Sequence, residues 1–280
     1  VLSNEHLEPV KDFLESVRGL FDELIVVDTG STDRTPEIAV EFGARVLSHV
    51  WRKDFSAARN VGLDAATGDW ILSLDADDEL PPETVAALPE LLARADGPEA
   101  IDGFTMIYRS LMPPDEVLTY TEMPVLRLFR NRPIYRYRLV VHEQILPALQ
   151  ENGGRTVATD LRILHHGYAS PTAQGGVDRN ERDRRILTDT LSQEPDNASL
   201  LFQLGGVALR QGSFIEARQL LERALSVDEH LGPVESALTT FYLSSLALKA
   251  GDPTQALAYA EASVCASTHS SPTLAHLNIA

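Results

Sequence analysis

The sequence predicts an α/β domain with a Rossmann-like, mostly parallel sheet, followed by an all-α domain of helical repeats. Two observations predict the α/β domain: apolar runs of strand length alternate with amphipathic helices, and two of these runs end abruptly in aspartates. One observation predicts the helical domain: beyond a stretch rich in serine, proline, threonine and glycine at 169–176, no strand pattern follows. We place the first domain at 1–172 and the second at 173–280.

Hydrophobic periodicity and capping residues predict the elements of the first domain. We expect a helix at 7–17 that ends near Gly19, a strand at 24–27, a helix from Thr35 to Gly43 and a strand at 45–47. A helix at 57–66 capped by Ser56, a strand at 70–74 and a helix that begins at 81–83 should follow. A strand, a helix and a strand within about 25 residues form a βαβ unit, which implies parallel pairing.

The rest of the first domain shows shorter apolar runs. Pro89 lies inside the helix that begins at 81–83, and proline removes a backbone donor, so we expect a kink or a split there. Further strands are expected at 104–108, 125–129, 139–141 and 161–164.

Small residues recur at a fixed offset in the second domain. Gly212, Ala217, Leu221 and Ala224 are followed 39 positions later by Gly251, Ala256, Ala260 and Ser263. Small residues at fixed places let paired helices pack closely, as in a helical repeat. The pattern resembles tetratricopeptide repeats, with Leu201, Leu204, Gly205, Ala208, Gly212, Phe214, Ala217 and Ala224 at the positions that this family favours. That family repeats about every 34 residues, so an insertion of about five residues is expected at 230–235.

The bulk composition is that of an ordinary globular protein of 280 residues, 44% hydrophobic and 23% charged. A net charge of −17 argues against general affinity for nucleic acid or anionic membranes. Cys265 is the only cysteine, so no intrachain disulfide can form and a reducing compartment is favoured. We find no signal peptide and no transmembrane run, and expect a cytoplasmic protein, with peripheral membrane association still open. We expect that the sequence is truncated at both ends, within a strand at its start and within a helix at its end.

Asp28 closes the strand at 24–27 and precedes a turn that contains Gly30 and Ser31. Ligands of open α/β sheets bind outside the carboxyl ends of the strands, where loops line a crevice. A carboxylate at this place can accept hydrogen bonds from the edge of a nucleobase. Alternatively, Asp28 and Asp33 only cap the helix that follows.

Asp75, Asp77 and Asp78 put three carboxylates within four positions at the end of the strand at 70–74. Their mutual repulsion would be offset by a cation or a donor-rich ligand. Residues i and i+2 share one side of an extended chain, so one carboxylate can take a ribose or sugar hydroxyl while the next binds a cation that bridges phosphates. Oxygen ligands suit Mg²⁺ or Mn²⁺. The alternative is a solvated acidic turn.

Three segments together carry a family resemblance: Asp28 to Asp33, Ala57 to Asn60, and Ala66 to Asp77. In order and spacing they resemble family 2 glycosyltransferases of the nucleotide-diphospho-sugar transferase (GT-A) superfamily. The resemblance implies a nucleotide-sugar donor, with a UDP-sugar favoured, and Mn²⁺ or Mg²⁺ as the cofactor. The resemblance implies that Asp28 lies near the nucleobase, with Ser31 and Asp33 in the same donor-binding turn. It implies that Arg59 lies near the donor, Asp75 near the ribose or the sugar, and Asp77 on the metal.

Glu143 follows a short apolar run, Val140-Val141, and His142. An inverting sugar transfer needs a base that takes the proton of the acceptor, and we predict Glu143 for that role. The His-Glu pair resembles one in glycosyltransferases that carry a tetratricopeptide domain. The alternative is that Glu143 forms a surface salt bridge with a nearby arginine, while His142 orients Glu143 or lies in the core.

His165 and His166 follow the strand expected at 161–164. Neutral imidazole is a good ligand for Mn²⁺ and would complete a site made otherwise of oxygen atoms. The resemblance points to His165, three places before Tyr168, as the metal ligand. A structural histidine is the alternative.

Five arginines are the exception to the acidic background: Arg127, Arg130, Arg132, Arg136 and Arg138. Guanidinium groups bind phosphate in a bidentate manner, so one or two of them could hold a diphosphate leaving group. For most of the five, a solvated strand face is the alternative.

These motifs favour a metal-dependent inverting glycosyltransferase that acts on a glycan, peptide or protein acceptor. Its repeats would handle the acceptor or a protein partner. A sugar nucleotidyltransferase is an alternative enzyme, although Asn4-Glu5-His6-Leu7 is not the glycine-rich phosphate loop such enzymes usually have. A third hypothesis is an inactive scaffold in which the repeats bind a protein and the α/β domain only holds a nucleotide.

Overall fold

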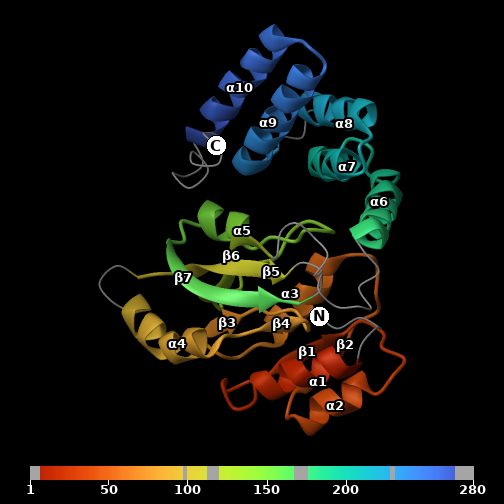
Figure 1. The fold of residues 1–280 in the computed structure, drawn as a ribbon. Coiled ribbons are helices and arrows are strands. Elements are labelled where there is room, and N and C mark those ends of the chain that lie inside the picture. The colour runs from red at the N-terminus through yellow and green to blue at the C-terminus, as the bar shows by residue number, and fades with distance from the viewer. Residues whose placement is uncertain (1–6, 97–99, 112–119, 167–175, 228–230, 269–280) are drawn as a thin grey trace. The chain divides into compact units, whose positions relative to one another are not determined.

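The chain divides into two units, residues 1–175 and 176–280. The computed structural model describes residues 7–96, 100–111, 120–166, 176–227 and 231–268 (Figure 1). Most of the linker expected at 169–176 lies outside the described residues. No helix in these described ranges is long and apolar enough to cross a membrane.

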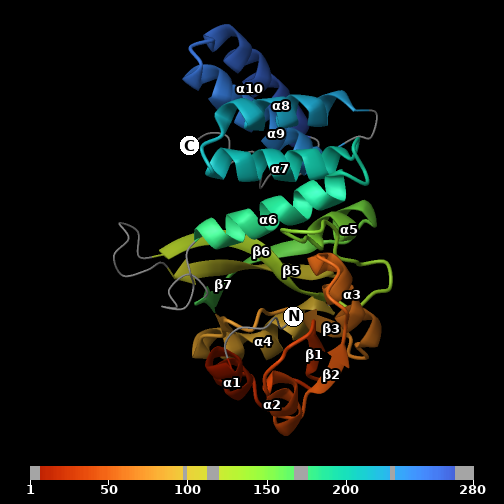
Figure 2. The same cartoon turned by 90° about the vertical axis from the view of Figure 1, so that its right-hand side faces the viewer.

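The first unit begins with a small βαβ module, as the sequence predicts. Helix α1 (Leu7–Ser16) precedes β1 (Ile25–Asp28), α2 (Thr35–Glu41) and β2 (Arg45–Ser48). β1 and β2 pair in parallel, with Asp28 opposite Ser48. Figure 2 shows α1 and α2 beside this strand pair. The Asp33 carboxylate accepts a hydrogen bond from the Thr35 N–H at 3.0 Å in the turn before α2, but the N-cap residue of α2 is Arg34, without a side-chain cap.

A second sheet of five strands forms the centre of the first unit. It contains β3 (Trp70–Leu72), β4 (Asp78–Glu79), β5 (Gly103–Leu111), β6 (Tyr120–Arg130) and β7 (Thr156–His165), in the order β3-β6-β5-β7-β4. The predicted α/β class is confirmed, but the expected mostly parallel pairing is wrong for this sheet. Only β5 and β7 pair in parallel, and the other three pairs are antiparallel. β5 ends at Leu111 and β6 begins at Tyr120, and this separation is too short for the crossover of a dozen or more residues that parallel pairing needs.

Helices cover both faces of this sheet. Phe104 and Met106 of β5 pack with Leu88 and Leu91 of α4 (Pro82–Ala95) in one buried cluster. On the other face, Phe129 of β6 packs with side chains of α3 (Phe55–Ala65) and α5 (Leu146–Glu151). Figure 1 shows α4 and α5 on opposite sides of the sheet.

Three local expectations are corrected. Asp54, and not Ser56, caps α3: its carboxylate accepts from the Ala57 N–H at 2.9 Å. The split expected at Pro89 is wrong: helix α4 continues as one helix, because the proline removes a single backbone bond while the buried side chains on either side hold the helix to the core. Residues 139–141 form no strand, since Leu139 has a φ of +77°, outside the β region.

The second unit consists of helix hairpins at the predicted offset. Its helices are α6 (Gly176–Leu191), α7 (Ala198–Arg210), α8 (Phe214–Ser226), α9 (Pro233–Lys249) and α10 (Pro253–Thr268). Gly212 and Gly251 lie in the turns of the hairpins α7–α8 and α9–α10, with φ of +74° and +78°. Part of the insertion expected at 230–235 lies in α9, and residue 230 lies outside the described residues.

Close packing within the α7–α8 hairpin depends on Gly205. A Cβ atom at this position would lie 2.8 Å from the Leu221 side chain, whereas one at Gly206 would meet only Arg210, at 3.8 Å. We expect Gly205→Ala to destabilise the second unit by about 1–3 kcal/mol through overpacking. Gly206→Ala should instead stabilise it by about 0.5–1 kcal/mol, because alanine loses less backbone entropy in a helix. Urea unfolding followed by circular dichroism measures both, and equal effects of the two variants would contradict the packing argument.

Candidate active site

The segment between β3 and β4 carries Asp75 and Asp77 from one edge of the sheet to the other, and Asp78 begins β4. β3 and β4 are the two edge strands of this sheet, so residues 73–77 pass the strands that lie between them. The Ser73 N–H donates to the Arg127 carbonyl of β6 at 2.9 Å, and the Asp78 N–H closes a turn by donating to the Asp75 carbonyl at 3.1 Å. Side chains from β6, β5 and β7 therefore meet the aspartates in that order.

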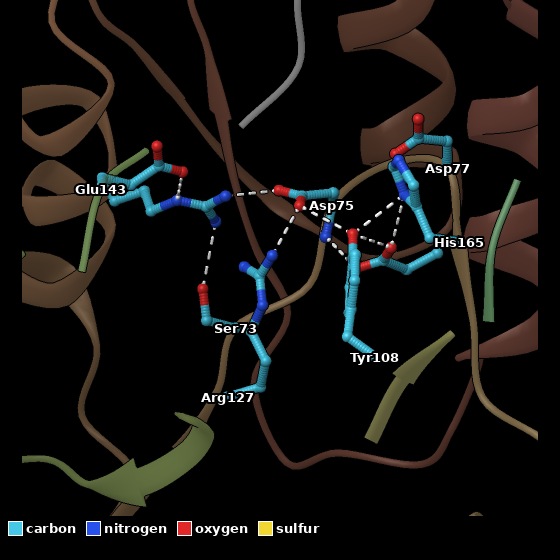
Figure 3. Close-up of polar contacts among 9 residues, drawn as sticks. Ser73, Asp75, Asp77, Tyr108, Arg127, Glu143 and His165 are labelled. Atoms are coloured by element: carbon cyan, nitrogen blue, oxygen red, sulfur yellow. Dashed lines mark hydrogen bonds and ion pairs between the residues drawn. The ribbon is translucent and has the colours of Figure 1, made fainter. Parts of the chain in front are cut away.

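Asp75 lies between two buried arginines. Arg59 of α3 donates from Nη2 to Asp75 Oδ1 at 2.5 Å, and Arg127 of β6 donates from Nη2 to Oδ2 at 2.8 Å. Figure 3 shows Arg127 pointing toward this carboxylate. Burial alone would raise the pKa of Asp75, but the charges of Arg127 and Arg59 outweigh burial and hold that pKa well below its usual value. Asp75 is therefore a fixed anion.

Asp77, Asp78 and His165 form a cluster in which two carboxylate oxygens and one imidazole nitrogen lie within 4.8 Å of one another. His165 is the last residue of β7 and pairs with Asp78 of β4 across the sheet. Its Nδ1 is 3.1 Å from Asp78 Oδ1 and 3.4 Å from Asp77 Oδ1 (Figure 3). Burial lowers the pKa of His165, but hydrogen bonds to Asp77 and Asp78 outweigh it and raise that pKa to about 9. Asp77 and Asp78 thus favour a positively charged group beside them.

The two carboxylates of this cluster differ in exposure. The Asp78 side chain is fully buried and the Asp77 side chain is 33% exposed. Asp78 Oδ2 accepts from the Asp75 N–H at 2.8 Å, and its Oδ1 accepts from the Tyr108 hydroxyl at 2.7 Å. Burial and the charge of Asp75 raise the pKa of Asp78. Asp77 is consequently the more available oxygen ligand for a cation.

Tyr108 connects the two parts of the site. Its hydroxyl lies 2.9 Å from His165 Nδ1 and 3.3 Å from Asp75 Oδ2, in addition to its bond to Asp78. Burial and the charges of Asp75 and Asp78 raise the pKa of Tyr108, which keeps the phenol protonated. A protonated phenol can donate to these acids without adding negative charge.

Glu143 reaches the same network through Arg59. Arg59 donates from Nε to Glu143 Oε1 at 2.6 Å and from Nη1 to the Ser73 hydroxyl at 3.2 Å. One buried guanidinium therefore links Glu143 with Asp75 and fixes their relative position. Glu143 and Asp77 lie at opposite ends of the network in Figure 3, with Asp75 between them. His142, which precedes Glu143, is exposed rather than in the core.

The predicted donor-binding turn lies at the end of β1. Asp28 is buried and its Oδ1 accepts from the Ser31 N–H at 3.0 Å. The Ser31 hydroxyl is buried without a hydrogen-bond partner. Ala76, between the site aspartates, packs against the hydrophobic cluster of α1, β1 and α2. This contact places the β1 module against the aspartate segment.

The predicted arginine cluster separates into one inward residue and four surface residues. Arg127 alone reaches the aspartates. The other four form ion pairs elsewhere, namely Arg130 with Asp96, Arg132 with Asp102, Arg136 with Asp64 and Arg138 with Glu151. His166 is not part of the cluster of Asp77, Asp78 and His165, and its Nε2 lies 2.8 Å from Glu79 Oε2.

Sequence reasoning missed the roles of Tyr108 and Asp78 in this site. Tyr108 alternates with Phe104 and Met106, so its pattern is that of a core residue, and only the pairing of β5 with β7 brings it beside His165. Asp78 is visible in the sequence as the third aspartate after Asp75 and Asp77, but the sequence does not show that its side chain is buried.

Comparison with known proteins identifies the family. Residues 2–144, about half of the chain, match the family model described as glycosyl transferase family 2. The chain belongs to this family. Residues 196–264 match a tetratricopeptide repeat model, which confirms the predicted repeats of the second unit.

Two relatives match most of the length of this family 2 chain. A TPR repeat-containing protein of Synechococcus elongatus is 38% identical over 245 residues, which cover 85% of this chain and 58% of that protein. The SPbeta prophage-derived glycosyltransferase SunS of Bacillus subtilis is 28% identical over 198 residues, or 70% of this chain and 45% of that protein. The chain thus spans about half the length of these relatives.

A solved structure has a fold similar to that of this chain. The crystal structure of residues 1–349 of TarS from S. aureus aligns with a TM-score of 0.50 at 17% identity, covering 94% of this chain and 88% of that one. At this identity the likeness concerns the fold alone.

The ion pairs of Asp75 should contribute to stability. Asp75→Asn leaves Arg127 without its anion and Arg59 with Glu143 as its remaining carboxylate, and we expect a loss of about 3 kcal/mol, near the lower end for such pairs because Asp75 is 25% exposed. Asp64→Asn is the matched control: its partner Arg136 is at the surface and Asp64 is 65% exposed, so the loss should stay below about 1 kcal/mol.

Urea unfolding at several pH values measures both variants. The lowered pKa means that the contribution of Asp75 is complete above its unfolded pKa of about 3.9 and is lost as the pH falls through the folded value. The difference between wild type and Asp75→Asn should therefore shrink toward low pH. Similar losses for both variants at neutral pH would contradict the analysis.

Proposed function

We propose that this chain is a metal-dependent, inverting glycosyltransferase that transfers a sugar from a nucleotide-diphospho-sugar to an acceptor nucleophile. The observation that carries the proposal is the single network that runs from Asp77, Asp78 and His165 through Tyr108, Asp75 and Arg59 to Glu143. A group able to hold a cation lies at one end of this network, and a carboxylate suited to act as a base lies at the other. Membership of glycosyl transferase family 2 supports the reaction class.

The cluster of Asp77, Asp78 and His165 fits a divalent cation. Ligand atoms of one Mn²⁺ or Mg²⁺ lie about 4 Å apart or less, and the three groups are within 4.8 Å of one another. Asp77 and His165 would hold the ion, with Mn²⁺ favoured by the imidazole ligand. Asp78 would fix His165 through its buried carboxylate, since both of its oxygens already accept hydrogen bonds. A bound ion would supply neutralisation of the charge that develops on the diphosphate.

Glu143 is the proposed base. The acceptor attacks the anomeric carbon of the sugar, its proton passes to Glu143, and the bond from that carbon to the diphosphate oxygen breaks to release a nucleoside diphosphate. Arg59 holds Glu143 Oε1, and Oε2 has no hydrogen-bond partner among the described residues, so it can receive the proton.

The donor would lie between the metal end and the loop after β1. We assign binding of the nucleobase of the donor to Asp28, Ser31 and Asp33. The buried unpaired hydroxyl of Ser31 supports a ligand there. Arg59 and Asp75 would border the sugar, with a UDP-sugar as the favoured donor. We place transfer in residues 1–172, and acceptor or partner binding in the repeats at 173–280, because stacked helix pairs form surfaces suited to peptides.

Asp77→Ala tests the metal site. We expect the variant to lose Mn²⁺-dependent donor binding in calorimetry, together with release of nucleoside diphosphate from a panel of UDP- and GDP-sugars. Asp69→Ala is the matched control, because Asp69 is an exposed aspartate at the opposite end of β3. Full retention of both activities in Asp77→Ala would refute the assignment, and release of pyrophosphate instead would favour a nucleotidyltransferase.

Glu143→Gln tests the base. We expect kcat to fall by about 10²- to 10⁴-fold while donor affinity stays within a few-fold, because a general base acts on the acceptor proton and not on donor binding. Glu122→Gln is the control, since Glu122 is also held by arginines but on β6, outside the network. An unchanged kcat in Glu143→Gln would remove Glu143 from the mechanism.

A further inference from the structure

Asn60 makes a contact that the proposed reaction leaves unexplained. It follows Arg59 on α3, and its side-chain amide binds both backbone groups of Tyr137. Asn60 Oδ1 accepts from the Tyr137 N–H at 2.9 Å, and Asn60 Nδ2 donates to the Tyr137 carbonyl at 3.0 Å. Such a two-point contact fixes a peptide in position and in orientation, as a strand neighbour would.

The segment that Asn60 holds leads directly into Glu143 and has an unfavourable backbone. Arg138 and Gln144 exchange two backbone hydrogen bonds at 3.0 Å and close the loop 139–143. Within this loop Leu139 has a φ of +77° and His142 a φ of +53°, values that side chains other than glycine rarely adopt. Conformations of this kind persist only where surrounding contacts impose them.

Helix α3 supplies those contacts along one edge of the loop. The Phe55 N–H at the start of the helix donates to the Val140 carbonyl at 3.0 Å, and the Ser56 hydroxyl donates to the Leu139 carbonyl at 2.6 Å. The first turn of a helix has N–H groups without partners inside the helix, so the loop and the helix satisfy each other. This explains why Ser56 does not cap α3.

We propose that Asn60 is a positioning residue for sugar transfer, which sets the place of Glu143 by holding the backbone of Tyr137. The inference rests on the proposed role of Glu143 as the base. Arg59 orients the Glu143 carboxylate directly, whereas Asn60 acts on the loop that carries it and touches no reacting group. Displacement of a catalytic group by about 1 Å can lower a rate by about 100-fold, so a backbone contact at this place can control catalysis.

The experiment compares Asn60→Ala with Asn131→Ala. Asn131 is a matched control in the same unit: its side-chain amide also binds backbone, donating to the Ala66 and Gly68 carbonyls at 3.0 and 2.9 Å, but it does not contact the loop 139–143. Release of nucleoside diphosphate with Mn²⁺ and each of several UDP-sugars gives kcat and KM. Hydrogen exchange of the peptide that covers 137–143, read by mass spectrometry, reports the hold on the loop without any need for activity.

For Asn60→Ala we expect kcat to fall by about 10- to 100-fold with the donor KM within about threefold of wild type, and faster exchange in 137–143. Asn131→Ala should change neither. Combining Asn60→Ala with Glu143→Gln should give no further loss beyond Glu143→Gln alone, because both changes act on one group. Asn60→Asp keeps the acceptor for the Tyr137 N–H and should recover part of kcat.

Several results would overturn the inference: unchanged exchange in Asn60→Ala, additive losses in the double variant, or a fall in kcat matched by Asn131→Ala. A wild-type protein without turnover would count against the proposed function instead. Exchange in 137–143 that rises only in Asn60→Ala would then still support the hold on the loop, and exchange that stays unchanged would still contradict it.

Discussion

The balance of charge around Asp75 is the interaction on which the rest of the site depends. Three aspartates within four positions cannot all be buried as unpaired anions. Arg59 and Arg127 neutralise Asp75, while Tyr108 and His165 satisfy the buried Asp78. Asp77 is left partly exposed beside an imidazole. Each aspartate therefore has a different environment, and the differences come from the neighbouring strands rather than from the run itself.

Topology explains how these neighbours are gathered. Because β3 and β4 are opposite edges of one sheet, the short segment between them must pass β6, β5 and β7. Each of those strands contributes one polar side chain to the site: Arg127 from within β6, Tyr108 from within β5 and His165 from the end of β7. The site is thus a product of strand order, and the same aspartate run in another topology would meet different partners.

Helix α3 has a second organising role. Its buried arginine joins the aspartate run to Glu143, and its first turns hold the loop from which Glu143 projects. This arrangement gives a physical reason for each residue type in the motif Ala-Ala-Arg-Asn at 57–60. Small residues such as Ala58, fully buried, let the helix approach the core. Arg59 then binds the side chains of Ser73, Asp75 and Glu143, and Asn60 binds the backbone of Tyr137.

The sequence by itself determined the α/β class, the βαβ module, the helical repeats and the acidic run, because these depend on local periodicity, caps and spacing. Tertiary structure alone decided that the larger sheet is mostly antiparallel and that Arg127, rather than the other four arginines, contacts the aspartates. It also decided that the hydroxyl of Tyr108, a residue with a core pattern, forms hydrogen bonds in the site. It also decided that the segment at 139–141 is a loop held by α3. Hydrophobic patterns mark which residues are buried, but they carry no information on which strands are neighbours, and that choice fixes which buried side chains meet.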